Sequence, residues 1–69
     1  MHQLAASVMI RKEILEQIAD AREILEITSA KLATEAEPAV LASLHRIRRE
    51  TSSTLAELEI MLDCLNGMN

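Results

Sequence analysis

The sequence predicts an all-α fold, an antiparallel two-helix hairpin of the coiled-coil type, with or without a short N-terminal helical turn. Two observations predict it. Apolar residues recur alternately three and four positions apart over two long stretches, a spacing typical of helices that pack on helices. Pro38, the only proline of the 69 residues, lies between these stretches. Proline fixes φ, lacks an N–H and pushes Glu37 away from helical geometry, so it opens a helix but does not sit inside one.

The first helix is expected over about residues 8–33, because residues 9–33 contain neither Gly nor Pro and are mostly good helix formers. Two starts are open. Either Ser7 caps a helix that runs from Val8, or the helix already begins near Gln3 with Ser7 inside it. The apolar seam of this helix is Ile14, Ile18, Ala21, Leu25, Thr28 and Leu32.

The turn is expected at residues 34–37, a length that suits neighbouring antiparallel helices. The second helix is expected over about residues 38–66, with Gly67 as its stop in the left-handed cap conformation. Its seam is Leu44, Arg48, Thr51, Leu55, Leu58, Leu62 and Leu65, flanked by Val40, Leu41 and Ile47. Residues 1–69 therefore form a single helical-hairpin domain.

Folding the chain at residues 35–37 predicts a register in which Ile14 meets Leu58 and Ala21 meets Thr51. Small residues then face each other midway, where residues 51–54 are four poor helix formers. Two interpretations of this run are open. The helices approach closely or a partner sits in the groove there, or the hydroxyls face water and bond back to carbonyls one turn earlier.

Size and composition indicate that the hairpin needs more buried surface than it has. A chain this short buries only about 60% of the surface that its unfolded state exposes. Phe, Tyr and Trp are absent, so the core lacks the side chains that contribute most area per residue. A second copy or a different partner is therefore expected to supply the remainder.

The net charge of −4 argues against a general nucleic-acid binder or a protein that binds anionic membranes. No apolar run approaches the roughly 20 residues that span a bilayer, and the N-terminus lacks the order of a secretory signal. Cys64 is the only cysteine, which favours a reducing compartment. We therefore expect a cytoplasmic protein.

The sequence offers no catalytic constellation. His2, His45 and Cys64 are the only candidates for nucleophilic or base chemistry, and the register places His45 near the turn but Cys64 near the termini. There is no i, i+4 pair of histidines and no Cys-x-x-Cys. We expect no enzyme, no cofactor and no metal site.

Several apolar residues point away from the seams or lie on their flanks when each helix advances by about 100° per residue. Clustered exposed apolar residues, methionine above all, are typical of docking surfaces. Arg48 adds a seam position where an arginine must reach out to water or meet a carboxylate. The basic run 45–49 either contacts an acidic partner or pairs with neighbouring glutamates. The candidate partner-binding residues are Met9, Ile24, Ile27, Arg48, Ile60, Met61 and Cys64.

The arrangement resembles the YscE-type small co-chaperones of bacterial type III secretion needle proteins. The resemblance is carried by the end of the first helix at residues 32–33, the turn 34–38, the mid-helix Arg49-Glu50-Thr51 and the apolar finish at residues 58–62. The chain departs from the family pattern at residues 41–44, where some members carry an aromatic residue.

The resemblance implies a bacterial cytoplasmic protein with a role in virulence. Such a protein stabilises a larger helical-repeat chaperone, and the two together keep the needle subunit unpolymerised before export. An alternative is a homodimeric four-helix-bundle regulator or adaptor, in which Met9, Ile60 and Cys64 face the second copy and Arg46 and Arg49 contact nucleic acid.

Overall fold

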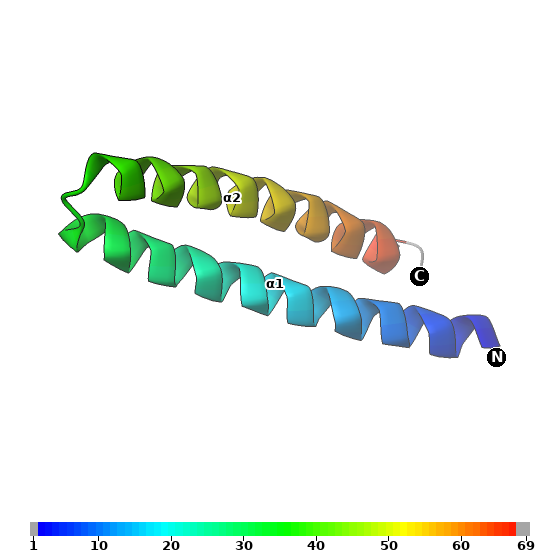
Figure 1. The fold of residues 1–69 in the computed structure, drawn as a ribbon. Coiled ribbons are helices and arrows are strands. Elements are labelled where there is room, and N and C mark those ends of the chain that lie inside the picture. Colours follow the sequence, from blue (N-terminus) through cyan, green and yellow to red (C-terminus); the bar gives the residue numbers. More distant parts are fainter. Residues whose placement is uncertain (1, 68–69) are drawn as a thin grey trace.

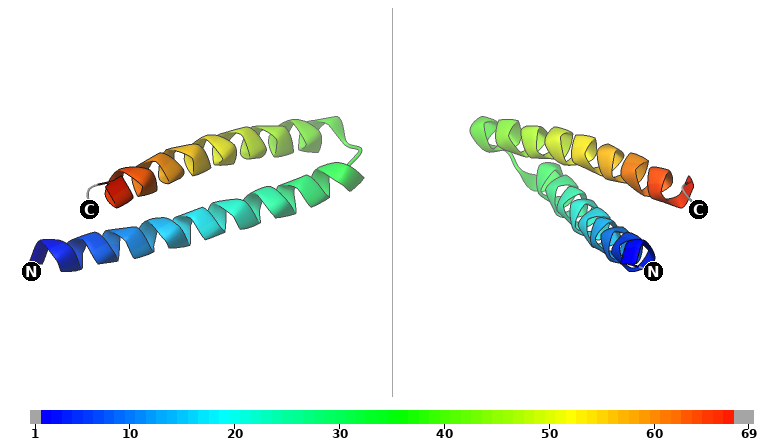
Figure 2. Two further views of the ribbon diagram at one scale, coloured as in Figure 1. Left: turned by 180° about the vertical axis from the view of Figure 1, so that it is seen from behind. Right: turned by 90° about the vertical axis from the view of Figure 1, so that its right-hand side faces the viewer.

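The computed structural model describes residues 2–67, and the side chains of residues 8–67, as two helices, α1 (His2–Thr34) and α2 (Pro38–Gly67). The helices run antiparallel and side by side in all three views (Figures 1 and 2). The Cα atoms extend over 54 × 14 × 14 Å, so the molecule is a rod only two helices wide. The predicted all-α hairpin is thereby confirmed.

The start of α1 differs from the expected residue 8. The helix begins at His2 and continues through Ser7, as the second of the two possible starts has it. The reason is that the segment before Val8 contains no Gly or Pro and includes the helix formers Leu4, Ala5 and Ala6. This end of α1 extends past the end of α2 (Figure 1).

The connection between the helices is residues 35–37. The N–H of Glu35 donates to the carbonyl of Lys31 at 2.9 Å, and the N–H of Leu41 donates to the carbonyl of Glu37 at 2.9 Å. The Glu35 carboxylate accepts from the N–H groups of Ala36 at 3.2 Å and Glu37 at 3.1 Å. This side chain therefore satisfies the two backbone donors that precede Pro38 and fixes the shape of the turn.

The second helix ends at Gly67, but the expected left-handed conformation of this glycine is wrong. Gly67 is the last residue of α2, and its φ is not positive. Glycine permits the left-handed cap conformation without requiring it, so the residue type alone did not determine the backbone here.

The core is a narrow seam between the helices. Its buried apolar side chains, each 4–8% exposed, are Ile14, Ile18, Ala21, Leu44 and Leu58. Half-buried leucines pack against the cluster of Ile14, Ile18 and Leu58 at the end where the termini meet; they are Leu55, Leu62 and Leu65. That cluster contains both members of the expected Ile14–Leu58 pair.

Every buried or half-buried side chain among residues 8–67 falls on the three-and-four spacing. In α1 these positions are 11, 14, 18, 21, 25, 28 and 32, with Glu35 following in the connection, and in α2 they are 41, 44, 51, 55, 58, 62 and 65. Within this range Thr28 is the one buried polar side chain, and its hydroxyl donates to the Ile24 carbonyl at 2.6 Å. The seam position Arg48 is exposed.

Candidate partner-binding surface

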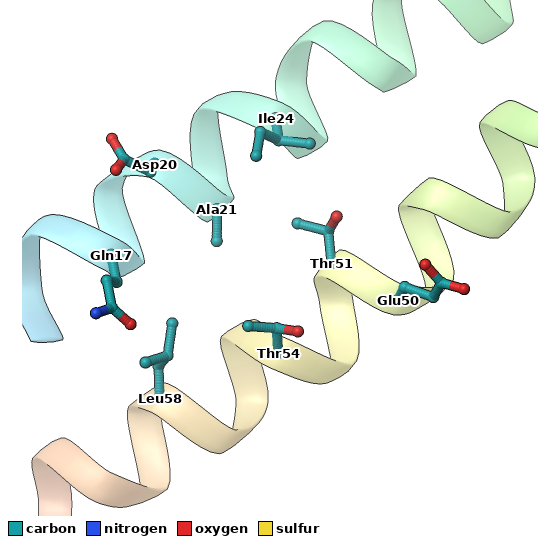
Figure 3. Close-up of a pocket in the computed structure, with 8 residues that line it drawn as sticks. All are labelled: Gln17, Asp20, Ala21, Ile24, Glu50, Thr51, Thr54 and Leu58. Atoms are coloured by element: carbon teal, nitrogen blue, oxygen red, sulfur yellow. The ribbon is translucent and has the colours of Figure 1, made fainter.

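The site begins with a hollow of about 400 Å³ that lies over the middle of the seam. Both helices line it, with Gln17, Asp20, Ala21 and Ile24 from α1 and Glu50, Thr51, Thr54 and Leu58 from α2 (Figure 3). Ala21 points across to α2, and Thr51 lies opposite it. The small side chains at these two seam positions leave the space that larger residues fill elsewhere in the core.

The hollow marks one side of the hairpin, which we call the groove face. Asp20 and Glu50 stand on its opposite rims and point away from the hollow (Figure 3). Steps of seven residues from the lining residues stay on the same side of a helix packed in this way. Such steps extend the groove face along both helices.

The groove face carries an apolar band. Steps of seven from Ile24 and Thr54 reach exposed apolar side chains on α1 and α2, namely Ile10, Val40, Ile47 and Met61. Together with Ile24 they are 36–49% exposed, so each packs partly against the seam and presents the rest to its surroundings.

The same face carries uncompensated carboxylates. Glu13 lies seven residues from Asp20, and Glu57 lies seven residues from Glu50. Ile27 and Cys64 come one further step along these two rows. Lys31 is the one basic residue at the corresponding positions of the described side chains. The groove face is therefore apolar along its centre and acidic at its rims.

The opposite side of the hairpin is balanced in charge. It holds the ion pair between Arg22 Nη2 and Glu59 Oε2, at 3.8 Å, which is the only one among residues 8–67. Both side chains are well exposed, at 65% and 50%, so the pair contributes little to stability. Residues three or four positions from the rows of Arg22 and Glu59 share this side of each helix and include both bases and acids, namely Lys12, Glu26, Arg49 and Asp63.

The structure brings together four of the candidate residues and separates the others. All of the candidates are exposed. On the groove face lie Ile24, Ile27, Met61 and Cys64. Met9, which is 71% exposed, lies on the outward side of α1 in a second hollow that α1 residues alone line. Ile60, which is 62% exposed, lies on the outward side of α2. Met9 and Ile60 therefore belong to different surfaces.

Arg48 reaches outward instead of meeting a carboxylate. Its Nη2 donates to Nδ1 of His45 at 3.2 Å, one turn earlier on α2. The two exposed side chains hold each other on the surface near the turn. The basic run 45–49 makes no ion pair with Glu50 or with the glutamates of α1 within the described residues.

Sequence reasoning missed several residues of the site. Ile10 is not among the candidates, and Val40 and Ile47 are expected only on the flank of the core, although each lies a multiple of seven residues from Ile24 or Met61. Arg11 was also missed as a seam residue. It lies three positions before Ile14, is half-buried, and its Nε is buried without a hydrogen-bond partner. A heptad count carried to both ends of each seam would have found all of these residues.

Among the described residues there is no group of three or more His, Cys, Asp or Glu side chains placed to hold a metal ion. Neither α1 nor α2, over residues 2–67, combines the length and apolar character needed to cross a membrane. Comparisons with protein-family models, with curated proteins and with solved structures find no match to this chain.

Proposed function

We propose that the chain is a non-enzymatic protein-binding subunit, a cytoplasmic co-chaperone of bacterial type III secretion. In this role it stabilises a larger helical-repeat chaperone and helps to keep the needle subunit unpolymerised. The observation that supports binding is that the chain has more solvent-accessible surface than a compact monomer of the same mass. A compact monomer of this mass has roughly 4,300 Å² of accessible surface, whereas this chain of 7.7 kDa has 5440 Å².

Large apolar side chains contribute to the exposed surface. Among residues 8–67, ten of them are at least 36% exposed, against five buried apolar residues in the core. A rod of two helices buries such side chains best against further helices, because ridges on one helix fit the grooves of another. A helical-repeat protein offers helices in that form. The assignment to type III secretion rests on the family resemblance of the turn and of the second helix.

The test is co-expression of the tagged chain with the helical-repeat chaperone and the needle subunit encoded beside it. We expect the three proteins to elute as one soluble complex in size-exclusion chromatography. Replacing Ile60→Asp together with Met61→Asp should remove the chaperone, because each change puts a charge on an exposed apolar side chain. The matched control is Ser52→Asp with Ser53→Asp, which adds the same charge at exposed polar positions. A needle subunit that stays soluble without this chain would contradict the proposal.

The second candidate is the homodimeric four-helix-bundle regulator or adaptor. The observation that favours it is that ten large apolar side chains among residues 8–67 are at least 36% exposed, a surface that a second hairpin would cover. Met9, Ile60 and Cys64 lie on different surfaces, so they do not share one interface with that copy. Sedimentation equilibrium of the pure chain decides between the two, since a stable dimer without affinity for the chaperone supports the regulator. Salt-sensitive RNA or DNA binding that is lost on Arg46→Ala and Arg49→Ala would support it further.

A further inference from the structure

We propose that the groove face binds a basic amphipathic helix of another protein, which lies along the hairpin as a third helix. This inference rests on the proposed function as a protein-binding subunit and names the surface and the kind of segment that is bound. Three observations carry it, namely the apolar band, the acidic rims and the excess of carboxylates over bases on the face, where Lys31 is the one base among the described side chains.

The apolar side chains of the groove face are spaced as in a surface that binds a helix. Ile24 of α1 lines the hollow on the side of the turn (Figure 3), and Ile47 of α2 lies one heptad from Thr54 in the same direction. Ile10 and Met61 continue the band toward the open end. Their spacing in steps of seven, or in multiples of seven, matches the repeat of an apolar stripe on a docked helix. The hollow at Ala21 and Thr51 leaves room for the bulkier side chains of that stripe.

The rims select the charge of the bound helix. Asp20 stands on the α1 rim and Glu50 on the α2 rim, so a helix between them meets a carboxylate on each flank. Glu13 and Glu57 repeat this arrangement one heptad toward the open end. None of these four carboxylates has an ion-pair partner among the described residues. A helix with Lys or Arg on both sides of its apolar stripe would pair with them, which gives specificity and a faster association.

A second copy of this chain fits the face poorly. Two groove faces in contact would bring both sets of carboxylates together, with Lys31 as the only base on each. Like charges that face each other across an interface oppose association. The occupant that matches this face is therefore a basic helix of a different protein.

The probe is a synthetic, fluorescently labelled amphipathic peptide of about three heptads, with leucines on its stripe and lysines on both flanks. Its partner probe has glutamates in place of the lysines. Fluorescence anisotropy with the full chain at moderate salt should show binding of the lysine peptide. We expect the glutamate peptide to bind at least about tenfold more weakly, because several partly exposed charge contacts are reversed together.

The decisive variant carries Asp20→Lys and Glu50→Lys, which leaves the groove face nearly neutral and should abolish the preference for the lysine peptide. Its matched control carries Glu26→Lys and Asp63→Lys, an equal change of net charge on the opposite side, and should keep the preference for the lysine peptide. For the apolar band, Ile47→Ser should weaken binding, whereas Leu15→Ser, at an exposed position of the opposite side, should not. Circular dichroism of each variant serves to check that it is still helical.

Three results would overturn the inference. They are equal binding of the two peptides by the unchanged chain, no binding of either by the folded chain, and a loss of preference in the control variant as large as that in the groove-face variant. Equal binding by a chain that still retains the helical-repeat chaperone would refute the inference and leave the proposed function standing. Binding with the expected preference, by a chain that retains no such chaperone, would support the inference while the type III assignment fails.

Discussion

Each seam carries one arginine, and the two side chains have different surroundings. Arg48 is exposed and reaches His45, so its guanidinium keeps a partner and access to water. Arg11 is half-buried, and its Nε has no partner within the described residues. A buried donor left without an acceptor costs about 1–3 kcal/mol. Arg11 therefore lowers the stability of the isolated hairpin at the start of its seam.

Arg11→Leu should raise the free energy of unfolding by about 1 kcal/mol, because it removes the unpaired donor and adds apolar surface to the seam. Urea denaturation followed by circular dichroism measures the change. The control is Lys12→Leu at the exposed neighbouring position, which should leave the midpoint nearly unchanged. A loss of stability in Arg11→Leu would show that the guanidinium makes a favourable contact in solution.

At the scale of the element, residues 51–54 of α2 are four poor helix formers, and they occupy two different environments in the structure. Thr51 and Thr54 line the hollow, whereas Ser52 and Ser53 are exposed and do not. The first pair shapes the groove face, and the second pair only lowers the helix propensity of α2. Ser52 and Ser53 are thus exposed, and no hydrogen bond from their hydroxyls to a carbonyl is found among the described residues. A partner in the groove at Thr51 and Thr54 stays a prediction.

Ser52→Ala with Ser53→Ala should raise the free energy of unfolding by roughly 0.5 kcal/mol per residue, because alanine is the better helix former. The same double variant should bind the lysine peptide as the unchanged chain does. Thermal and urea denaturation give the first quantity, and anisotropy gives the second. Weakened peptide binding would mean that these hydroxyls take part in the groove face after all.

The elements were predictable because the chain is governed by two simple signals. The three-and-four spacing marks the seams, and Pro38 marks the connection. The start of α1 was not determined because Ser7 fits a cap and a helix interior alike. The geometry of Gly67 was not determined because glycine takes either sign of φ.

For the site, the sequence identified exposed residues on each helix separately. Deciding that Ile24 and Met61 share a side while Met9 and Ile60 do not requires the relative placement of both helices.

At the scale of the whole molecule, charge is distributed unevenly around the rod. The net charge is −4, the groove face holds four unpaired carboxylates, and the only described ion pair lies exposed on the other side. Self-repulsion on one face and a weak pair on the other mean that electrostatics, in sum, opposes folding of the free chain.

Raising the salt concentration should therefore raise the melting temperature of the chain, because screening weakens the repulsion more than it weakens one exposed pair. Melting followed by circular dichroism over a series of sodium chloride concentrations measures this. The effect should shrink in the variant with Asp20→Lys and Glu50→Lys, in which the groove face is nearly neutral. A melting temperature that falls as salt is added would show that attractive pairs dominate instead.

The two helices of the hairpin are held together near both ends of the molecule. At one end the chain itself joins the helices through residues 35–37, and at the other the cluster of Ile14, Ile18 and Leu58 holds them together. Between these two points Ala21 faces Thr51, and less apolar surface resists separation there. We therefore expect the two helices to separate transiently near the middle of the hairpin, where the packing is weakest. The open end, which the apolar cluster holds together, should separate less often.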